Sequence, residues 1–471
     1  MKKTIPALAI LLLSLSLSAQ QTTKTERKEA FVSHLKQHYR PYGFVRNYFA
    51  YDSRESYSGT GDLFNYQPKD VLWNQTEAEA AVSGIPRQDL NAVATFRILS
   101  ITTRGGLDIV DYKWGKTEFG AKIEADFYAG LGGTAHKLSG VAQFRLRHAY
   151  ITLAWDSLYL NNRDCARVQL LIGQYWHPMA ADLADVIALN TGAPFGPFNR
   201  SPQVKLDARL GRYFTLTAAG LWQMQYMSNG PEGLSADYIA YSKTPEAYLG
   251  LSFHTPDFLL RAGADVLSIA PRHIGSQTNA SGTSVQVLVS DRLTTVSPFL
   301  YLQYKKGDFS LKAKSIFAEA GEHMQMNGGY GVSRVNADGS YDYTPTRTSS
   351  SWLSLVYRGK VGKQEDKHPQ RLEGILFAGY VYNLGTKAPL AQKADGSLVG
   401  YYYTRGENMN QMWRLTPTLV WTIGHFQLGC EYEITSVQYG EGQISPANGL
   451  SESGRHWVTN HRIQLMTKYN F

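Results

Sequence analysis

Charged side chains recur at every second position in several short segments of this chain. Lys122, Glu124 and Asp126 alternate with apolar residues, and the charges of Gln203–Leu210 alternate in the same way. Successive side chains of a strand point to opposite faces, so this spacing gathers the charges on one face. Ionised groups are stable in water and attract or repel ions there. The pattern therefore predicts a wet wall along which a polar solute can pass.

Sixteen residues are expected to line this wall, and basic residues dominate the set. Eleven bases minus five acids leave +6, and rings of basic side chains favour anions in pores, so we hypothesise a mild anion preference. The set is Arg97, Lys122, Glu124, Asp126, Arg145, Arg147, Lys205, Asp207, Arg209, Lys312, Lys314, Arg414, Glu431, Glu433, Arg462 and Lys468.

A second group of charges lies in the long segment Trp176–Ser201. The segment is apolar and holds three prolines, which is typical of a compact loop packed against a wall from the inside. It contributes Asp182, Asp185 and Arg200, which we expect to set the local field at the narrowest point of the passage. The alternative is that these charges cap a short helix or turn.

The remaining chemical motifs are weak. His34 and His38 stand four apart, as two metal ligands do, but no third ligand is evident and a solvated pair explains them. Asp338-Gly339 and Asp395-Gly396 resemble pieces of a calcium loop, and tight Asp-Gly turns explain both. The sequence contains no nucleophile-elbow, zinc-protease or P-loop motif, so we expect no enzyme, metal or cofactor.

The elements that must position these charges are strands rich in aromatic and β-branched residues, divided by Gly, Pro, Asn and Asp. Sixteen are predicted: Tyr42–Asp52, Val93–Asp111, Thr117–Ala129, Val141–Asp156, Arg167–Tyr175, Pro202–Leu210, Tyr213–Met227, Glu246–Phe253, Phe258–Ser268, Leu293–Lys305, Asp308–Glu322, Ser349–Tyr357, Arg371–Asn383, Gln411–Ile423, Phe426–Val437 and Val458–Phe471.

Long and short connections alternate between these strands. Gly211-Arg212 and Gly424-His425 are two-residue turns, whereas Ser53–Ala92 spans 40 residues. This alternation is typical of transmembrane β-barrels, which have short periplasmic turns and long extracellular loops. Two turns, Ser157–Ala166 and Arg358–Gln370, are longer than the rule predicts. The predicted fold is an all-β, antiparallel transmembrane barrel of about 16 strands with an inward-folded third loop.

A bilayer decides which face of each strand carries the charges. An Arg or Lys facing lipid at the midplane costs about 2–4 kcal/mol, so the charged faces must look into the lumen. An amphipathic sheet over a soluble core, the alternative, would alternate in the same way. Tyrosine and tryptophan at predicted strand ends resemble the two aromatic girdles of outer-membrane barrels; they include Trp114, Tyr226, Tyr301, Tyr357 and Tyr439.

Composition excludes several other classes of protein. The 471 residues include 43% apolar and 18% charged residues and only two cysteines, which excludes a disordered chain and a disulfide scaffold. A mean hydropathy of -0.30 argues against a helical membrane protein. The net charge of +8 is spread along the chain without a basic block, so we expect no nucleic acid as partner.

The N-terminus carries an export signal. Lys2 and Lys3 precede an apolar run, and Ala19 supplies a small residue before polar ones, so we expect a signal peptide over residues 1–19. A periplasmic segment with a short helix follows over 20–41, and the barrel occupies 42–471. The protein is therefore expected in the outer membrane of a Gram-negative bacterium, with the bilayer as its partner.

The chain ends on a predicted strand, and its last residue, Phe471, is aromatic. This resembles the C-terminal signal of outer-membrane proteins. The chain resembles porins: Asn190–Phe198 is similar to a group of porin-like barrels from gut anaerobes, and Gly173–Trp176 with Arg200–Gln203 is similar to trimeric porins for phosphate or dicarboxylates. The resemblance implies passive diffusion of small polar, anion-leaning solutes through a homotrimeric channel whose third loop folds inward.

Two other functions stay open at this point. Some outer-membrane barrels are hydrolases with sites on the outer wall, and His148, on the predicted lipid-side phase, is the one residue that suggests this here. The long loop Ser53–Ala92 could instead bind a partner, as in an adhesin or scaffold.

Overall fold

The computed structural model describes residues 33, 35, 37–59, 64–100, 102–129, 142–160, 163–361, 369–400, 402–451 and 453–471. The predicted signal peptide and His34 lie outside the described residues. Within them, no helix combines the length and the apolar character that crossing a membrane requires.

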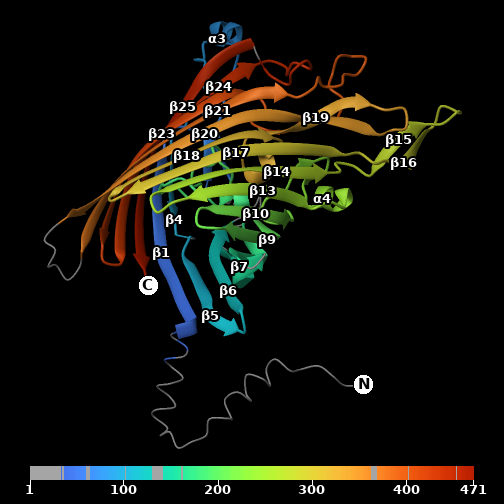
Figure 1. Cartoon of the computed structure of the whole chain (residues 1–471). Helices are drawn as coiled ribbons and strands as arrows, with labels where there is room; N and C mark the ends of the chain where they lie inside the picture. The colour runs from blue at the N-terminus through green and yellow to red at the C-terminus, as the bar shows by residue number, and fades with distance from the viewer. Residues whose placement is uncertain are drawn as a thin grey trace, which may run out of the picture.

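The chain forms a closed antiparallel β-barrel of sixteen strands, as predicted (Figure 1). β1 (Tyr39–Asp52) closes the barrel by pairing with β25 (Ser453–Asn470), from Phe44 opposite Asn470 to Asp52 opposite Arg462. β4 (Thr95–Leu99) and β5 (Arg104–Trp114) both pair with β1 and act as one interrupted wall strand. The remaining wall strands are β6 (Thr117–Ala129), β7 (Ala142–Leu160), β8 (Arg163–Trp176), β9 (Arg200–Leu210), β10 (Phe214–Leu221), β13 (Glu246–His254), β14 (Phe258–Ile269), β17 (Leu293–Lys306), β18 (Phe309–Glu319), β20 (Tyr341–Val361), β21 (Gln370–Thr386), β23 (Met409–Ile423) and β24 (Phe426–Glu441).

Short turns and long loops lie at opposite ends of the barrel. The short turns and the start of β1 share one end with the C-terminus, which makes it the periplasmic end of an outer-membrane barrel (Figure 1). The predicted long turn Ser157–Ala166 is wrong: β7 extends to Leu160 and β8 begins at Arg163, with Leu158 opposite Ala166 and Leu160 opposite Arg163. Part of the other exception, Arg358–Gln370, lies outside the described residues.

The two faces of the wall differ as a barrel in lipid requires. Along β23, Trp413, Leu415 and Leu419 are exposed on the outside, while Arg414 and Thr416 between them are buried. Apolar side chains exposed over the whole exterior would be costly in water and are stable against lipid. The aromatic prediction holds for some residues only. Trp114 and Tyr357 are exposed, but Tyr301 and Tyr439 are buried because their positions lie on the inward phase of their strands.

The other elements belong to the long loops. Loop 1 (residues 53–94) contains the hairpin of β2 (Ser56–Gly59) and β3 (Phe64–Pro68) and the helix α3 (Glu77–Ser83). α3 begins at a capping box, in which the Thr76 side chain accepts from the Glu79 backbone and Glu79 accepts from Thr76. The remaining loop elements are β11 (Asn229–Gly230), β12 (Gly233–Leu234), α4 (Asp237–Ser242), β15 (Ile274–Thr278), β16 (Ser284–Leu288), β19 (Gly328–Val335), β22 (Tyr403–Arg405) and the 3-10 turns η2 (Pro178–Ala180) and η3 (Gly321–Met324).

Three loop segments meet inside the barrel. They are the β2–β3 hairpin of loop 1, loop 3 (residues 177–199) and the segment around η3. The ring of Phe198 lies 4.8 Å from that of Phe64, and the Phe198 backbone N–H donates to the Met324 carbonyl at 2.8 Å. The inward-folded third loop is therefore confirmed, and loop 1 joins it in the lumen.

Candidate functional site: the barrel interior

The wall beneath loop 3 is shaped to receive it. Gly379 on β21 has no side chain, and a Cβ there would lie 2.5 Å from the ring of Phe195 in loop 3. A Cβ at Gly429 on β24 would lie 3.1 Å from Ile187. Phe195 is fully buried and Ile187 nearly so. Loop 3 is thus packed into recesses of one side of the wall.

Three of the predicted wall residues hold the loops in place. Glu431 accepts hydrogen bonds from the backbone N–H groups of Ile187 (2.8 Å) and Ala188 (3.1 Å). Arg414 donates to the carbonyls of Ala193 and Tyr66, at 3.3 and 2.8 Å, and Lys314 donates to a carbonyl of loop 3. All three are at most 2% exposed. They point inward, as alternation predicts, but the loops cover them.

The two aspartates of loop 3 are paired with cations of the wall. Asp182 lies 2.5 Å from Arg261 on β14, and Asp185 lies 2.9 Å from Lys312 on β18. They do not cap η2, the short helix of this loop, because its cap is His177, whose Nδ1 accepts from the Met179 N–H. Both charges are thus partly compensated where they meet the lumen.

Arg200 lies at the other end of loop 3, where β9 begins. Its guanidinium carbon lies 4.5 Å from the ring centre of Trp176 and 5.2 Å from that of Phe198, and the side chain is 1% exposed. None of its three nitrogens has a hydrogen-bond partner among the described residues. Aromatic faces attract a cation, so the two rings explain part of its stability in this position.

The opposite side of the barrel carries a cluster of cations that we call the basic wall: Arg46, Arg104, Arg145, Arg147 and Lys468 around Glu124 and Asp126. Arg145 and Arg147 lie 2.9 Å from Asp126, and Arg147 also lies 2.7 Å from Glu124. Arg104 lies 3.6 Å from both carboxylates. Five cations against two carboxylates leave a net charge of 5 − 2 = +3.

The ring of Phe44 connects the rest of the basic wall. Its centre lies 4.8 Å from the Arg46 guanidinium, 5.1 Å from that of Arg104 and 4.5 Å from the Lys468 Nζ. The Arg104 and Arg145 side chains each remain 20% exposed, in contrast with the covered Lys314. Solvent therefore reaches Arg104 and Arg145 of the basic wall.

A β-bulge builds part of this cluster. Glu124 pairs with His148, whereas the next residue, Ala125, pairs with Leu146, so Arg147 is an extra residue in β7. A bulge interrupts the alternation of faces. Arg147 and His148 are both buried inside, and His148 lies 3.7 Å from Glu124. The predicted lipid-side position of His148 is therefore wrong, and the hydrolase hypothesis loses the residue that suggested it.

The other predicted wall residues lie in smaller clusters. Lys122 pairs with Asp108 at 2.7 Å, and Lys205 pairs with Asp207 at 2.6 Å. Arg209 is exposed near a periplasmic turn, and Arg97 is half-buried on β4. Glu433 lies 3.4 Å from Arg414, and Arg462 lies 3.7 Å from Asp52.

Sequence reasoning missed Arg46, Arg104 and Arg261. Arg46 shares the inward phase of β1 with Tyr48, and that alternation was a usable signal. Arg104 follows directly on the interruption between β4 and β5, where the phase of the strand is lost. No alternation in the sequence could assign it to a face.

One buried cluster has the residue types of a metal site. His177, Glu246 and Asp265 bring their ligand atoms within 4.8 Å of one another, and His323 lies 3.1 Å from Glu246. His177 Nδ1 already accepts the Met179 N–H, so the ring proton sits on Nε2 and points at Glu246, 2.9 Å away. That nitrogen has no lone pair for a metal. The hydrogen bonds therefore fit an anchor for the start of loop 3.

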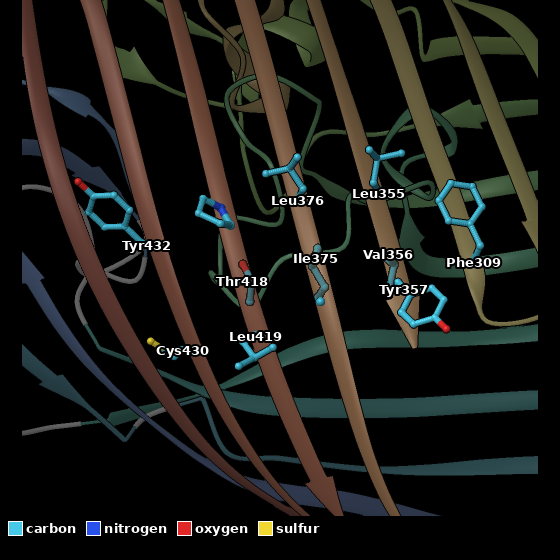
Figure 2. Close-up of a pocket in the computed structure, with 12 residues that line it drawn as sticks. Phe309, Leu355, Val356, Tyr357, Ile375, Leu376, Thr418, Leu419, Cys430 and Tyr432 are labelled. Carbon is cyan, nitrogen blue, oxygen red and sulfur yellow. The ribbon is translucent and has the colours of Figure 1, made fainter. Parts of the chain in front are cut away.

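One hollow of the described surface lies outside the barrel. It is a groove of about 540 Å³ across β18 to β24, and its lining is almost wholly apolar. Figure 2 shows Leu355, Leu376 and Leu419 on neighbouring strands around it, with Cys430 and Tyr432 at one side. Since this is the lipid-facing surface, the groove is not on the path of a polar solute.

Comparison with solved structures supports the fold. The outer-membrane channel DcaP of Acinetobacter baumannii is similar over 92% of this chain and 97% of its own, with 17% identity and a TM-score of 0.59. An anion-selective porin from Comamonas acidovorans is similar over 92% and 99%, with 10% identity and a TM-score of 0.46. No protein-family model and no curated protein matches the chain. The chain has the fold of the outer-membrane porins.

Proposed function

We propose that this protein is an outer-membrane channel that lets small polar solutes diffuse passively and favours anions. The barrel supplies the channel: sixteen strands enclose more space than their side chains fill, whereas eight strands enclose a packed interior. Loop 3 narrows that space from one side.

The basic wall is the single observation that carries the anion preference. Its net charge of +3 faces loop 3 across the lumen, where Asp182 and Asp185 are paired with Arg261 and Lys312. A passing anion therefore meets uncompensated positive charge and no matching negative charge. Assembly as a homotrimer, which the resemblance to porins implies, belongs to the same proposal, and the mass of the complex in detergent tests it.

A planar bilayer measurement tests the proposal. The purified protein should give stable, step-like currents, and in a KCl gradient the reversal potential should have the sign set by chloride. A reversal potential of the opposite sign would contradict the anion preference. A folded, inserted barrel without conductance would contradict the channel itself.

A further inference from the structure

A polar cavity lies at the extracellular end of the barrel, apart from the basic wall. It has a volume of about 420 Å³ and is formed where loop 1 meets residues 404–408, from the end of β22 to the start of β23. This volume falls within the roughly 300–1,000 Å³ of small-molecule sites. We call it the vestibule pocket.

Two tyrosines give the vestibule pocket a rigid aromatic floor, and a third offers a free face. The Tyr439 hydroxyl donates to the Pro68 carbonyl at 2.6 Å, and the Tyr66 hydroxyl donates to Gln325. Both side chains are at most 5% exposed. Tyr57, by contrast, is 50% exposed. An entering molecule with an apolar face can therefore cover the Tyr57 ring without moving the other two.

Arg405 brings an unpaired positive charge to the same cavity. Its guanidinium carbon lies 4.5 Å from the ring centre of Tyr66, which fixes its position. Among the residues that the structure describes, Arg405 forms no ion pair, and its Nη1 is buried without a hydrogen-bond partner. Two carboxylates also line the cavity: that of Asp70 is engaged, at 2.6 Å from His456, and that of Glu407 belongs to an exposed side chain. The free cation calls for a carboxylate or similar anion on the ligand.

The rest of the lining selects against a purely aromatic acid. Seven of the eleven lining residues carry polar side chains other than tyrosine. Asn408 makes no side-chain hydrogen bond within the described part of the chain, and Gln67 makes only long ones, at 3.4 and 3.5 Å. A ligand that left these amides unpaired on displacing water would bind more weakly, because a buried polar group without a hydrogen-bond partner is costly. Hydroxyl groups would satisfy them.

We infer that the vestibule pocket binds a sugar acid of monosaccharide size: its carboxylate on Arg405, its C–H face on the Tyr57 ring and its hydroxyls on Asn408 and Gln67. This inference rests on the proposed function, since it names the class of anion that the channel admits. The pocket holds such a solute at the mouth, before it reaches the basic wall.

Calorimetry on the folded barrel in detergent tests the inference with three probes. Glucuronate carries both the carboxylate and the hydroxyls, glucose lacks the carboxylate, and benzoate lacks the hydroxyls. We expect glucuronate to bind at least tenfold more tightly than either of the others. Equal binding of glucose would remove the role of Arg405, and tighter binding of benzoate would identify an aromatic-acid site; either result overturns the inference.

Variants assign the binding to this pocket. Arg405→Gln should weaken glucuronate binding at least tenfold. Tyr57→Ala should also weaken glucuronate binding. Because Tyr57 is half-exposed, its variant should fold even if Arg405→Gln does not. The matched control is Arg334→Gln: Arg334 is an exposed loop arginine paired with Asp342, and its loss should leave binding unchanged. Glucuronate binding that survives in both pocket variants overturns the inference.

The reversal potential of the same preparation separates the two proposals. Chloride selectivity with no glucuronate binding would leave the channel function intact and reject only the pocket. Glucuronate binding in a cation-selective barrel would reject the proposed anion preference and leave the pocket as a surface site.

Discussion

Arg104→Gln is the sharpest test of the basic wall. The substitution lowers the net charge of the cluster from +3 to +2. Glu124 keeps Arg147 at 2.7 Å, and Asp126 keeps Arg145 at 2.9 Å, so neither carboxylate is left unpaired. Because Arg104 contacts both carboxylates only at 3.6 Å, its loss should leave the barrel folded.

The size of the effect follows from Coulomb's law. A unit charge at about 6 Å from a passing ion in water contributes ~0.7 kcal/mol, and screening at 0.1 M salt reduces this to ~0.4 kcal/mol. The interaction energy has opposite signs for chloride and potassium. The difference between the energies of the two ions therefore changes by ~0.8 kcal/mol, which is about fourfold in the permeability ratio. At 1 M salt the Debye length is about 3 Å, and the effect should fall below about twofold.

Reversal potentials in KCl gradients measure the permeability ratio of chloride to potassium. One gradient is centred on about 0.1 M salt and the other on about 1 M, so both expected changes in this ratio are tested. The control is again Arg334→Gln. It changes the total charge of the protein by the same amount as Arg104→Gln, but Arg334 is an exposed residue of an extracellular loop. An unchanged permeability ratio at 0.1 M in the folded Arg104→Gln protein would refute the role of the basic wall. An equal loss of selectivity at both salt concentrations would refute the electrostatic mechanism.

Three further predictions test the fit of the loops and the wall. Gly379→Leu should raise the single-channel conductance and expose loop 3 to protease, because the new side chain needs the space of the Phe195 ring; unchanged conductance and protease resistance would contradict the packing of loop 3. Gly173→Ala should lower the free energy of unfolding in detergent by about 1–3 kcal/mol, since φ is +132° and a Cβ would lie 2.2 Å from the Ala149 carbonyl oxygen; an unaltered denaturation midpoint would count against this. Burial in η3 raises the pKa of Glu322 to about 7, so the folded state holds its proton while the unfolded state releases it near 4.5. The free energy of unfolding should therefore fall by about 3 kcal/mol as pH rises from about 4.5 through 7, and Glu322→Gln should remove this dependence. If denaturant unfolding gave the same pH profile for the natural protein and the Glu322→Gln variant, the prediction would be refuted.

Strand periodicity made most of the barrel predictable. A strand with lipid on one side and water on the other must alternate apolar and polar residues, so each strand signals its own faces. The predicted strand Phe426–Val437 matches β24 from its first residue, and Arg371–Asn383 lies within β21. The boundaries were less predictable at Ser157–Ala166, where β7 extends to Leu160 and pairs with β8 from Arg163.

Alternation also placed Lys314, Arg414 and Glu431 correctly on the inner face, but it could not say what stands in front of them. Their carbonyl and N–H partners belong to loops that lie more than 100 residues away in the sequence. A loop conformation depends on the recesses available in the wall, such as the one at Gly379, and those exist only once the barrel has closed.

The sequence by itself thus determined the number of strands, their faces and the end of the barrel that carries long loops, because these depend on neighbours along the chain. Only the tertiary structure decided which charges meet. Barrel closure sets Arg46 directly opposite Lys468, and the bulge in β7 turns both Arg147 and His148 inward. The field that a solute meets is a sum over such neighbours, and through-space distances between remote strands are not encoded in the spacing of any one of them.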